Sequence, residues 1–340
     1  MTSHRNLVRE SAGLRRRSLV RLASALPLAA LARGAWAQEF PAHPFRLIVP
    51  FPAGGPTDAL ARLAAESLAA SLNQPVVVEN KAGAGGGIAA ELVSRSPADG
   101  STLLVAGQGL MFINKPLYQR KKLGYDPDAD YAYVGMLGSF PNVIVCNPDK
   151  VAAHTIGELL AAARANPGRI AYGSNGIGSL THLTAEVLAK AAKVEFLHIP
   201  YQGAAPQMTD LLSGRIDFSI IASQGVMGLI EQKKVRALAV STATRFAELP
   251  NVPTLVESGF PMLDVPVWFG VYAPAATPAP VLAKLRSALA AVTASPQYAA
   301  ELAKRHAQVL HVPVAASEAV FARERQLWAD AVRHTGASAE

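Results

Sequence analysis

Cysteine is almost absent from this 340-residue chain, which has only Cys146. One thiol excludes a disulfide framework and any CxxC zinc or redox site, and we expect it to be buried. Aromatic residues make up 6% of the chain and charged residues 17%, yet the apolar half of the sequence is ample for a hydrophobic core. The length fits one large domain or two of medium size.

Positive charge is scarce outside the N-terminus. The formal net charge is +7, but residues 1–37 hold seven Arg and a single acid, Glu10. Residues 38–340 therefore carry 25 basic and 24 acidic side chains, a net charge of +1. Since that balance gives no sign of a basic surface, we expect no nucleic acid as a partner.

The N-terminal segment has the layout of an export signal. Three arginines at 15–17 precede an apolar run over 22–32, and Ala35-Trp36-Ala37 supplies a small-residue cleavage motif. The apolar run is shorter than the about 20 residues that span a bilayer. We expect a signal peptide over residues 1–37, cleaved near Ala37. Residues 16–21, RRSLVR, are similar to a twin-arginine motif, with an ordinary secretory leader as the alternative.

Apolar runs alternate with helix-like segments through most of the remaining chain. The runs are continuous rather than alternating in polarity, which is typical of strands covered on both faces. We predict strands at 45–51, 76–79, 102–106, 142–146, 170–173, 196–201, 216–222 and 235–241. We predict helices at 60–72, 159–165, 183–192, 207–212, 278–292, 296–307 and 317–333. This order predicts an α/β fold with mainly parallel sheets flanked by helices.

A strand, a Gly-rich turn and a helix occur at 47–72 and again at 170–192. Two α/β lobes, each with its own strand-to-helix loop, would produce this repeated order of elements. Ligands of open α/β sheets bind beyond the carboxyl ends of strands, where such loops lie.

The first turn, residues 50–58 or PFPAGGPTD, is a candidate anion site that we call loop 1. Glycines let a ligand approach the backbone, and the helix that follows offers its unpaired N–H groups and its positive dipole end. A carboxylate placed there needs no cationic side chain. We expect Thr57 or Asp58 to cap the helix, and capping alone is the alternative role for Asp58.

The second turn, residues 172–182 or YGSNGIGSLTH, is loop 2. It adds hydroxyl groups to the backbone donors, and its alternative is a tight structural turn capped by Ser or Thr. His182 could donate to an anion or simply pack against its helix. Two further stretches, around Gln108 and around Tyr201, could reach a ligand, with a surface turn and packing at the sheet end as their alternatives.

Familiar catalytic templates are missing. The glycines at 83–87 suggest a dinucleotide-binding GxGxxG turn, but its last position is Ile88. The P-loop, HExxH and GxSxG motifs do not occur. Ser179 and His182 could form a nucleophile–base pair, although nothing nominates a third member. Carboxylates do not cluster into a metal site, so we expect neither a metal nor a cofactor.

Eight segments in their order resemble the Bug family of periplasmic solute-binding proteins, receptors of tripartite tricarboxylate transporters. The segments are 49–58 VPFPAGGPTD, 78–86 VENKAGAGG, 114–118 NKPLY, 173–182 GSNGIGSLTH, 200–203 PYQG, 210–217 DLLSGRID, 249–254 LPNVPT and 268–270 WFG. The likeness covers nearly all of residues 40–335. Departures occur at 107–112, GQGLMF, and 218–224, FSIIASQ, two edges that help to set ligand identity.

The resemblance implies a two-lobed, Venus-flytrap periplasmic binding protein of the second class. Lobe 1 would comprise residues 38–141 and 266–340, and lobe 2 residues 142–265. In the family a ligand carboxylate sits on loop 1, often through waters, and loop 2 grips the distal part. The ligand-binding residues we expect are Phe51, Ala53, Gly54, Gly55, Asp58, Gln108, Ser174, Asn175, Gly176, Gly178, Ser179, Thr181, Tyr201 and Gln202.

The same resemblance implies a function. We expect a monomeric periplasmic protein, not an enzyme, that captures a small organic carboxylate and delivers it to the membrane permease subunits of a tripartite transporter. The ligand would be a di- or tricarboxylate or an aromatic acid. One alternative is a ligand sensor acting on a receptor kinase. Another is an exported serine hydrolase that uses Ser179 and His182.

Overall fold

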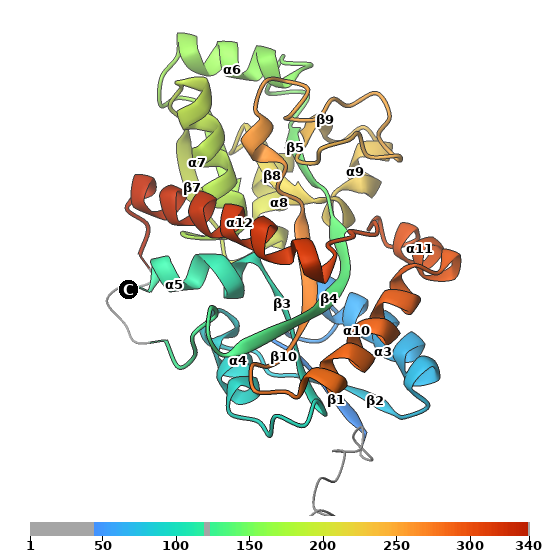
Figure 1. The fold of residues 1–340 in the computed structure, drawn as a ribbon. Helices are drawn as coiled ribbons and strands as arrows, with labels where there is room; N and C mark the ends of the chain where they lie inside the picture. Colours follow the sequence, from blue (N-terminus) through green and yellow to red (C-terminus); the bar gives the residue numbers. More distant parts are fainter. Residues whose placement is uncertain (1–43, 119–122, 339–340) are drawn as a thin grey trace, which may run out of the picture. The chain divides into compact units, whose positions relative to one another are not determined.

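Two five-stranded sheets organise the chain (Figure 1). The computed structural model describes residues 44–118 and 123–338. Sheet A has the order β2-β1-β3-β10-β4. Its strands are β1 (Phe45–Val49), β2 (Val76–Asn80), β3 (Thr102–Gly107), β4 (Tyr131–Phe140) and β10 (Val267–Pro274). Sheet B has the order β7-β6-β8-β5-β9. Its strands are β5 (Asn142–Cys146), β6 (Ala171–Ser174), β7 (Leu197–Pro200), β8 (Phe218–Ala222) and β9 (Arg236–Val240).

Helices connect the strands and cover the sheets. Those joined in sequence to sheet A are α3 (Pro56–Leu72), α4 (Gly87–Ser94), α5 (Asn114–Leu117), α10 (Ala279–Thr293), α11 (Pro296–Ala303) and α12 (Val314–Thr335). Those of sheet B are α6 (Ile156–Ala165), α7 (Leu180–Ala192), α8 (Ala204–Leu212) and α9 (Met227–Glu231). Short helical turns are η2 (Ala84–Gly86), η3 (Gly109–Ile113), η4 (Ser223–Gly225) and η5 (Pro261–Leu263). In the described part of the chain, no helix has the length and apolar character needed to cross a membrane.

The chain passes between the sheets at two places. Only Pro141 separates β4 of sheet A from β5 of sheet B, and residues 241–266 lead back from β9 to β10. Asn142 marks the first crossing, where its side-chain amide donates to the Val265 carbonyl of the second at 3.2 Å. The two connections therefore lie side by side. Helix α12 also links the two parts, since it packs on α5 and β4 as well as on α7.

The sheets are mixed, which corrects the prediction of mainly parallel sheets. In sheet A, β1 pairs in parallel with β2 and β3, whereas β10 runs antiparallel to β3 and β4. In sheet B, β6 is parallel to β7 and β8, whereas β5 is antiparallel to β8 and β9. The antiparallel pairs all involve β5 or β10, the strands that follow the two crossings.

All eight predicted strands form, with ends within two residues of the prediction. Strands β4 and β10 were missed, because glycines interrupt both and the ladder between them has two register shifts. All seven predicted helices form; most begin earlier than predicted, since their first turns lie outside the apolar pattern, and α11 ends at Ala303. Cys146 is fully buried, as predicted.

Candidate functional site

Loop 1 leads from β1 into the start of α3. Gly55 is the N-cap of α3, with φ −81° and ψ 172°, so the prediction that Thr57 or Asp58 would cap this helix is wrong. Among the described residues, no side chain accepts a hydrogen bond at this cap. The first intrahelical bond runs from the Ala59 amide to the Gly55 carbonyl at 3.0 Å. The amides of Thr57 and Asp58 thus have no intrahelical acceptor, and both residues are 3% exposed.

The buried side chain of Asp58 fixes the backbone of loop 1 through hydrogen bonds. Asp58 is 3% exposed, and its carboxylate accepts from the Gly54 amide, from Arg62 Nε and from Asn80 Nδ2, each at 2.9 Å. Burial acts to raise the pKa of Asp58, but the bonds from Arg62, Gly54 and Asn80 outweigh it and lower that pKa. The carboxylate is therefore ionised, and Arg62 offsets its charge beside the helix start.

The tip of loop 1 faces solvent. Phe51 is 39% exposed, and Ala53 and Gly54 are also exposed. Asn80 Nδ2 donates to the Phe51 carbonyl at 3.0 Å, so the same amide fixes both the loop and Asp58. Loop 1 therefore combines a fixed backbone with an accessible surface.

The polar groups of loop 2 mostly serve the loop itself. Ser179 caps α7 by accepting from the His182 amide at 3.3 Å. Thr181 Oγ1 accepts from the Asn175 amide at 3.0 Å, and Ser174 Oγ accepts from the Gly176 amide at 3.1 Å. Ser174 and Thr181 are buried. The predicted alternative of a tight turn capped by Ser describes this part of the loop.

His182 is buried and accepts through its ring. The Gly178 amide donates to Nδ1 of His182 at 3.1 Å, and burial lowers the pKa of the imidazole to about 4. His182 therefore bonds loop 2 rather than donating from Nδ1 to an anion. The hydroxyl of Ser179 bonds the His182 backbone and Thr181, not the ring. The nucleophile–base pair of a hydrolase is not formed.

The two outlying candidates differ in their availability. Gln108 is 2% exposed, and its side-chain amide bridges two backbone groups, donating to the Pro266 carbonyl at 2.6 Å and accepting from the Trp268 amide at 3.3 Å. The surface turn considered for it is wrong. Tyr201 is half-buried and donates its hydroxyl to Asp210 at 2.8 Å. Gln202 and Asn175 are exposed.

Loop 2 touches the sheet A part of the chain at Gly178. A Cβ built on Gly178, whose φ is +75°, would lie 2.6 Å from Cδ1 of Leu117 in α5. Sequence reasoning missed Leu117, because a leucine 61 positions away carries no sign of this partner. Only glycine fits at 178 while Leu117 occupies this place.

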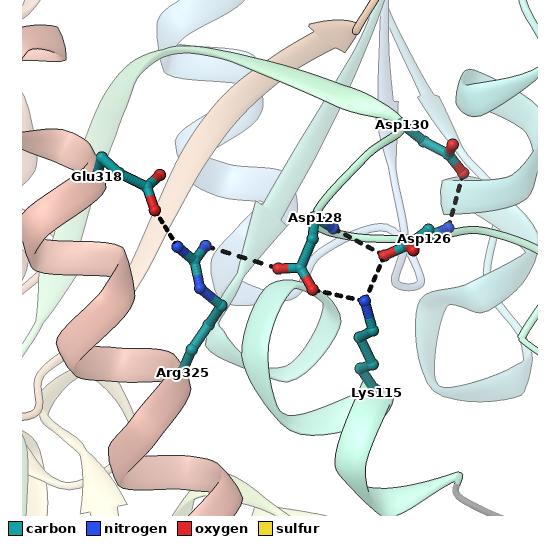
Figure 2. A network of polar contacts seen from close by, with 6 residues as sticks. All are labelled: Lys115, Asp126, Asp128, Asp130, Glu318 and Arg325. Atoms are coloured by element: carbon teal, nitrogen blue, oxygen red, sulfur yellow. Dashed lines mark hydrogen bonds and ion pairs between the residues drawn. The ribbon is translucent and has the colours of Figure 1, made fainter.

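Short helix α5 is itself anchored by an ionic network (Figure 2). Lys115 bonds Asp126 at 2.8 Å and Asp128 at 2.6 Å, and Asp128 lies 3.6 Å from Arg325 of α12. Arg325 also pairs with Glu318. The hydrogen bonds of Lys115 to the two aspartates raise its pKa, so the network stays charged at neutral pH. It fixes the helix that presents Leu117.

Metal ligands do not gather within residues 44–118 and 123–338: no group of three or more His, Cys, Asp or Glu side chains there is placed to hold an ion. The network of Figure 2 is accordingly a set of ion pairs.

Comparison with known sequences gives a family. Residues 60–332 match the model of the tripartite tricarboxylate transporter family receptor. Protein BugT of Bordetella pertussis is 35% identical over 301 residues, 88% of this chain and 92% of that protein. A UPF0065 protein from the tcbD-tcbE intergenic region of Pseudomonas sp. strain P51 is 38% identical over 283 residues, 83% of each chain.

Solved structures agree with this family. The Rhodopseudomonas palustris protein Rpa4515 with adipate has a TM-score of 0.75 at 31% identity, covering 88% of this chain and 99% of that one. The periplasmic binding protein BugD has a TM-score of 0.71 at 35% identity, covering 88% and 99%. MatC from R. palustris with bound malate has a TM-score of 0.71 at 29% identity, covering 86% and 100%. This chain therefore belongs to the tripartite tricarboxylate transporter receptor family and has the two-lobed fold of its periplasmic solute-binding proteins, which are not enzymes.

Proposed function

We propose that this protein captures a small organic carboxylate between loop 1 and loop 2 and delivers it to the membrane subunits of a tripartite transporter. Two structures of the same family were solved with adipate and with malate, both small dicarboxylates. The observation that carries the proposal is the uncapped start of α3, which leaves two backbone donors without intrahelical acceptors beside an exposed loop. The fold of the family supplies the second lobe needed to enclose the other end.

The first carboxylate group is held by backbone donors. The amides of Thr57 and Asp58 receive it at the positive end of the α3 dipole. Phe51, Ala53 and Gly54 form the exposed rim beside it. The Asp58 carboxylate accepts from the Gly54 amide, so in this proposal the Gly54 amide shapes the loop and does not itself bind the ligand.

The distal end of the ligand meets loop 2. The Ser179 hydroxyl accepts from the His182 amide as the α7 cap. The amides of Leu180 and Thr181, in the first turn of the helix, have no intrahelical acceptors. Asn175 and Gln202 are exposed near the loop and offer side-chain amides. Ser174 and Gln108 are buried and bonded, so in this proposal they shape the site and leave the direct contacts to others.

Such a site has enough binding free energy without a fixed cation. A hydrogen bond to a charged group contributes about 1.5–3 kcal/mol, and a helix end about 0.3–2 kcal/mol. Micromolar binding corresponds to about 8 kcal/mol net of association costs, which several such donors supply. A ligand that touches both lobes favours the closed state, and its moderate affinity permits release to the transporter.

The decisive experiment is a ligand panel on the mature protein. Adipate, malate, other di- and tricarboxylates and aromatic acids are tested by thermal shift and then by calorimetry. Binding of at least one acid, with the uncharged diamide of the same acid inactive, is the expected result. If no acid raises the melting temperature, while the protein purified from its native cells also carries no acid by mass spectrometry, the proposal is wrong.

Delivery to the transporter takes place in the periplasm, where proteins of this family act. The signal peptide over residues 1–37 lies outside the described residues and stays a prediction, as does the choice between the twin-arginine and the general secretory route. N-terminal sequencing of the periplasmic protein, with Gln38 expected as its first residue, tests the cleavage site.

A further inference from the structure

A stack of four rings crosses the sheet B lobe and ends at loop 2. Phe218 stacks on Tyr172 at a centroid distance of 5.5 Å, and Tyr172 stacks on His198 at 4.9 Å. His198 stacks on His182 at 4.1 Å, with 17° between the ring planes. These rings come from β8, β6, β7 and α7, so the stack ties loop 2 to the core of the lobe.

Both histidines bond loop 2 through their ring nitrogens. Nδ1 of His182 accepts from the Gly178 amide at 3.1 Å. Nε2 of His198 lies 2.7 Å from Oγ of Ser174, which in turn accepts from the Gly176 amide at 3.1 Å. The two rings therefore hold the loop at two glycine amides, one directly and one through a hydroxyl.

The bond from Gly178 requires an unprotonated Nδ1. A neutral imidazole has one donor and one acceptor nitrogen, so His182 must carry its proton on Nε2. A protonated ring would set one N–H against another and break the bond. Stacking at 4.1 Å adds a second constraint, since two cationic rings would repel each other.

The surroundings of the pair favour the neutral form. Burial lowers the pKa of His182 to about 4; burial and the neighbouring His182 lower that of His198 to about 4. Tyr172 donates to Glu186 at 2.6 Å. The other charged or titratable groups that line the same cavity as Glu186 are His334, Arg164, Lys190, Lys193 and Glu195. Glu186 acts to raise the pKa of His198, but burial outweighs it.

The position of Gly178 matters because it meets the other lobe. Leu117 of α5 abuts this residue, and α5 is fixed by the ionic network around Lys115 (Figure 2). A shift of the loop at 178 would therefore alter both the contact between lobes and the amides at the start of α7.

We propose that His182 and His198 are positioning residues for ligand capture: as a neutral stacked pair they hold loop 2 in the conformation that meets the ligand and Leu117, and protonation of the pair releases it. The inference rests on the proposed function only in its last step, the ligand. The geometry of the rings and of Gly178 can be tested without any ligand.

The first experiment uses ¹⁵N-labelled histidine in the mature protein and follows the ring nitrogens by NMR from pH 7 to pH 3.5. His182 is expected to show an unprotonated Nδ1 and a protonated Nε2 down to about pH 4. Protonation of both nitrogens of His182 at pH 6, or the opposite tautomer, would overturn the inference whatever the ligand result.

The second experiment compares two variants at the same ring. His182→Asn keeps an acceptor near the position of Nδ1, whereas His182→Leu fills similar space without one. We expect the Gly178 amide resonance to stay in place in the first variant and to shift and exchange faster in the second. If both variants leave this amide unchanged, the rings do not position the loop.

The third experiment measures adipate and malate affinity by calorimetry at pH 7 and pH 4. His182→Leu should bind about 30-fold more weakly than wild type, and His182→Asn within about threefold. Protonation of the ligand weakens binding to both proteins equally and cancels in the ratio of wild-type to His182→Asn affinity. This ratio should fall towards pH 4, because only the wild type has a His182 ring to protonate. Exposed His154 provides the control variant His154→Leu, which should bind as wild type.

The outcomes separate the two proposals. If the ring tautomer and the Gly178 amide behave as expected but affinity is unchanged in His182→Leu, loop 2 is not the ligand site and the proposed function is wrong there. If affinity falls in His182→Leu and is not rescued in His182→Asn, the hydrogen bond is not what positions the loop.

Discussion

Loop 1 and loop 2 follow the same local plan, a strand, a glycine-rich turn and a helix, yet they differ in how their donors are used. At loop 1 the cap of α3 is Gly55, and the one buried carboxylate, Asp58, points back to the Gly54 amide. At loop 2 Ser179 caps α7, and hydroxyl and imidazole groups bond most of the turn.

The two loops are therefore suited to different steps of ligand binding. Loop 1 leads into a helix start whose backbone donors have no side-chain cap, so it is suited to receive the first charged group of a ligand. Loop 2 is held by buried partners and is suited to present a fixed surface when the lobes meet. Rigid polar networks limit the entropy that binding must remove.

Breaking the contact between loop 2 and Leu117 should have the largest effect. Gly178→Val places a branched side chain at φ +75° against Leu117 Cδ1, so strain and overlap together should weaken ligand binding by at least about 100-fold. Calorimetry with adipate and malate measures the loss. Adding Leu117→Ala should recover part of it; no recovery at all would show that Leu117 is not the obstacle.

The stability of the loop 2 lobe should depend on pH. The pKa of His182 is about 4 in the folded protein and ordinarily 6.5, so the unfolded chain binds more protons between these values. The contribution of His182 is therefore complete above pH 6.5 and falls as the pH drops towards 4, by on the order of 3 kcal/mol.

Urea unfolding at pH 7, 5.5 and 4 measures this loss. His182→Asn, which does not titrate there, should show a weaker pH dependence in the same window. Equal slopes for the two proteins would contradict the assignment of a neutral, buried His182.

Loosening loop 1 should cost less. Asp58→Asn keeps the shape of the side chain but weakens its bonds from Gly54 and Arg62, so we expect about tenfold weaker ligand binding. Arg62→Gln, which removes the partner and keeps Asp58, is the matched control and should have a smaller effect. Affinity unchanged in Asp58→Asn would mean that the bonds of the carboxylate hold loop 1 without shaping the site.

Giving α3 a side-chain cap like that of α7 should have the smallest effect of these changes: it should raise stability slightly and weaken ligand binding. Gly55 has extended backbone angles and 3.6 Å between a built Cβ and the nearest atom, so serine fits there. Gly55→Ser should stabilise the fold by about a few tenths of a kcal/mol, and its hydroxyl should compete with the ligand for an amide. Thermal melting and calorimetry measure the two changes; a variant that melts higher and binds better would contradict the open-donor account.

Local sequence patterns determined much of this protein. The apolar runs identified eight of the strands, the turn chemistry identified both loops, and eight segments indicated the family. They succeeded because strand and helix periodicity, turn residues and helix starts are properties of consecutive residues.

Contacts between distant residues were decided by the tertiary structure. Strands β4 and β10 pair across more than 120 residues of chain with two register shifts, and Asp58, expected as a cap, bonds Gly54, Arg62 and Asn80 instead. The partners of loop 2, Leu117 and His198, lie far from it in the chain. No local pattern encodes these partners, because the burial of side chains exists only once the sheets and helices have packed. That packing lowers the pKa of the two histidines and leaves room only for glycine at 178.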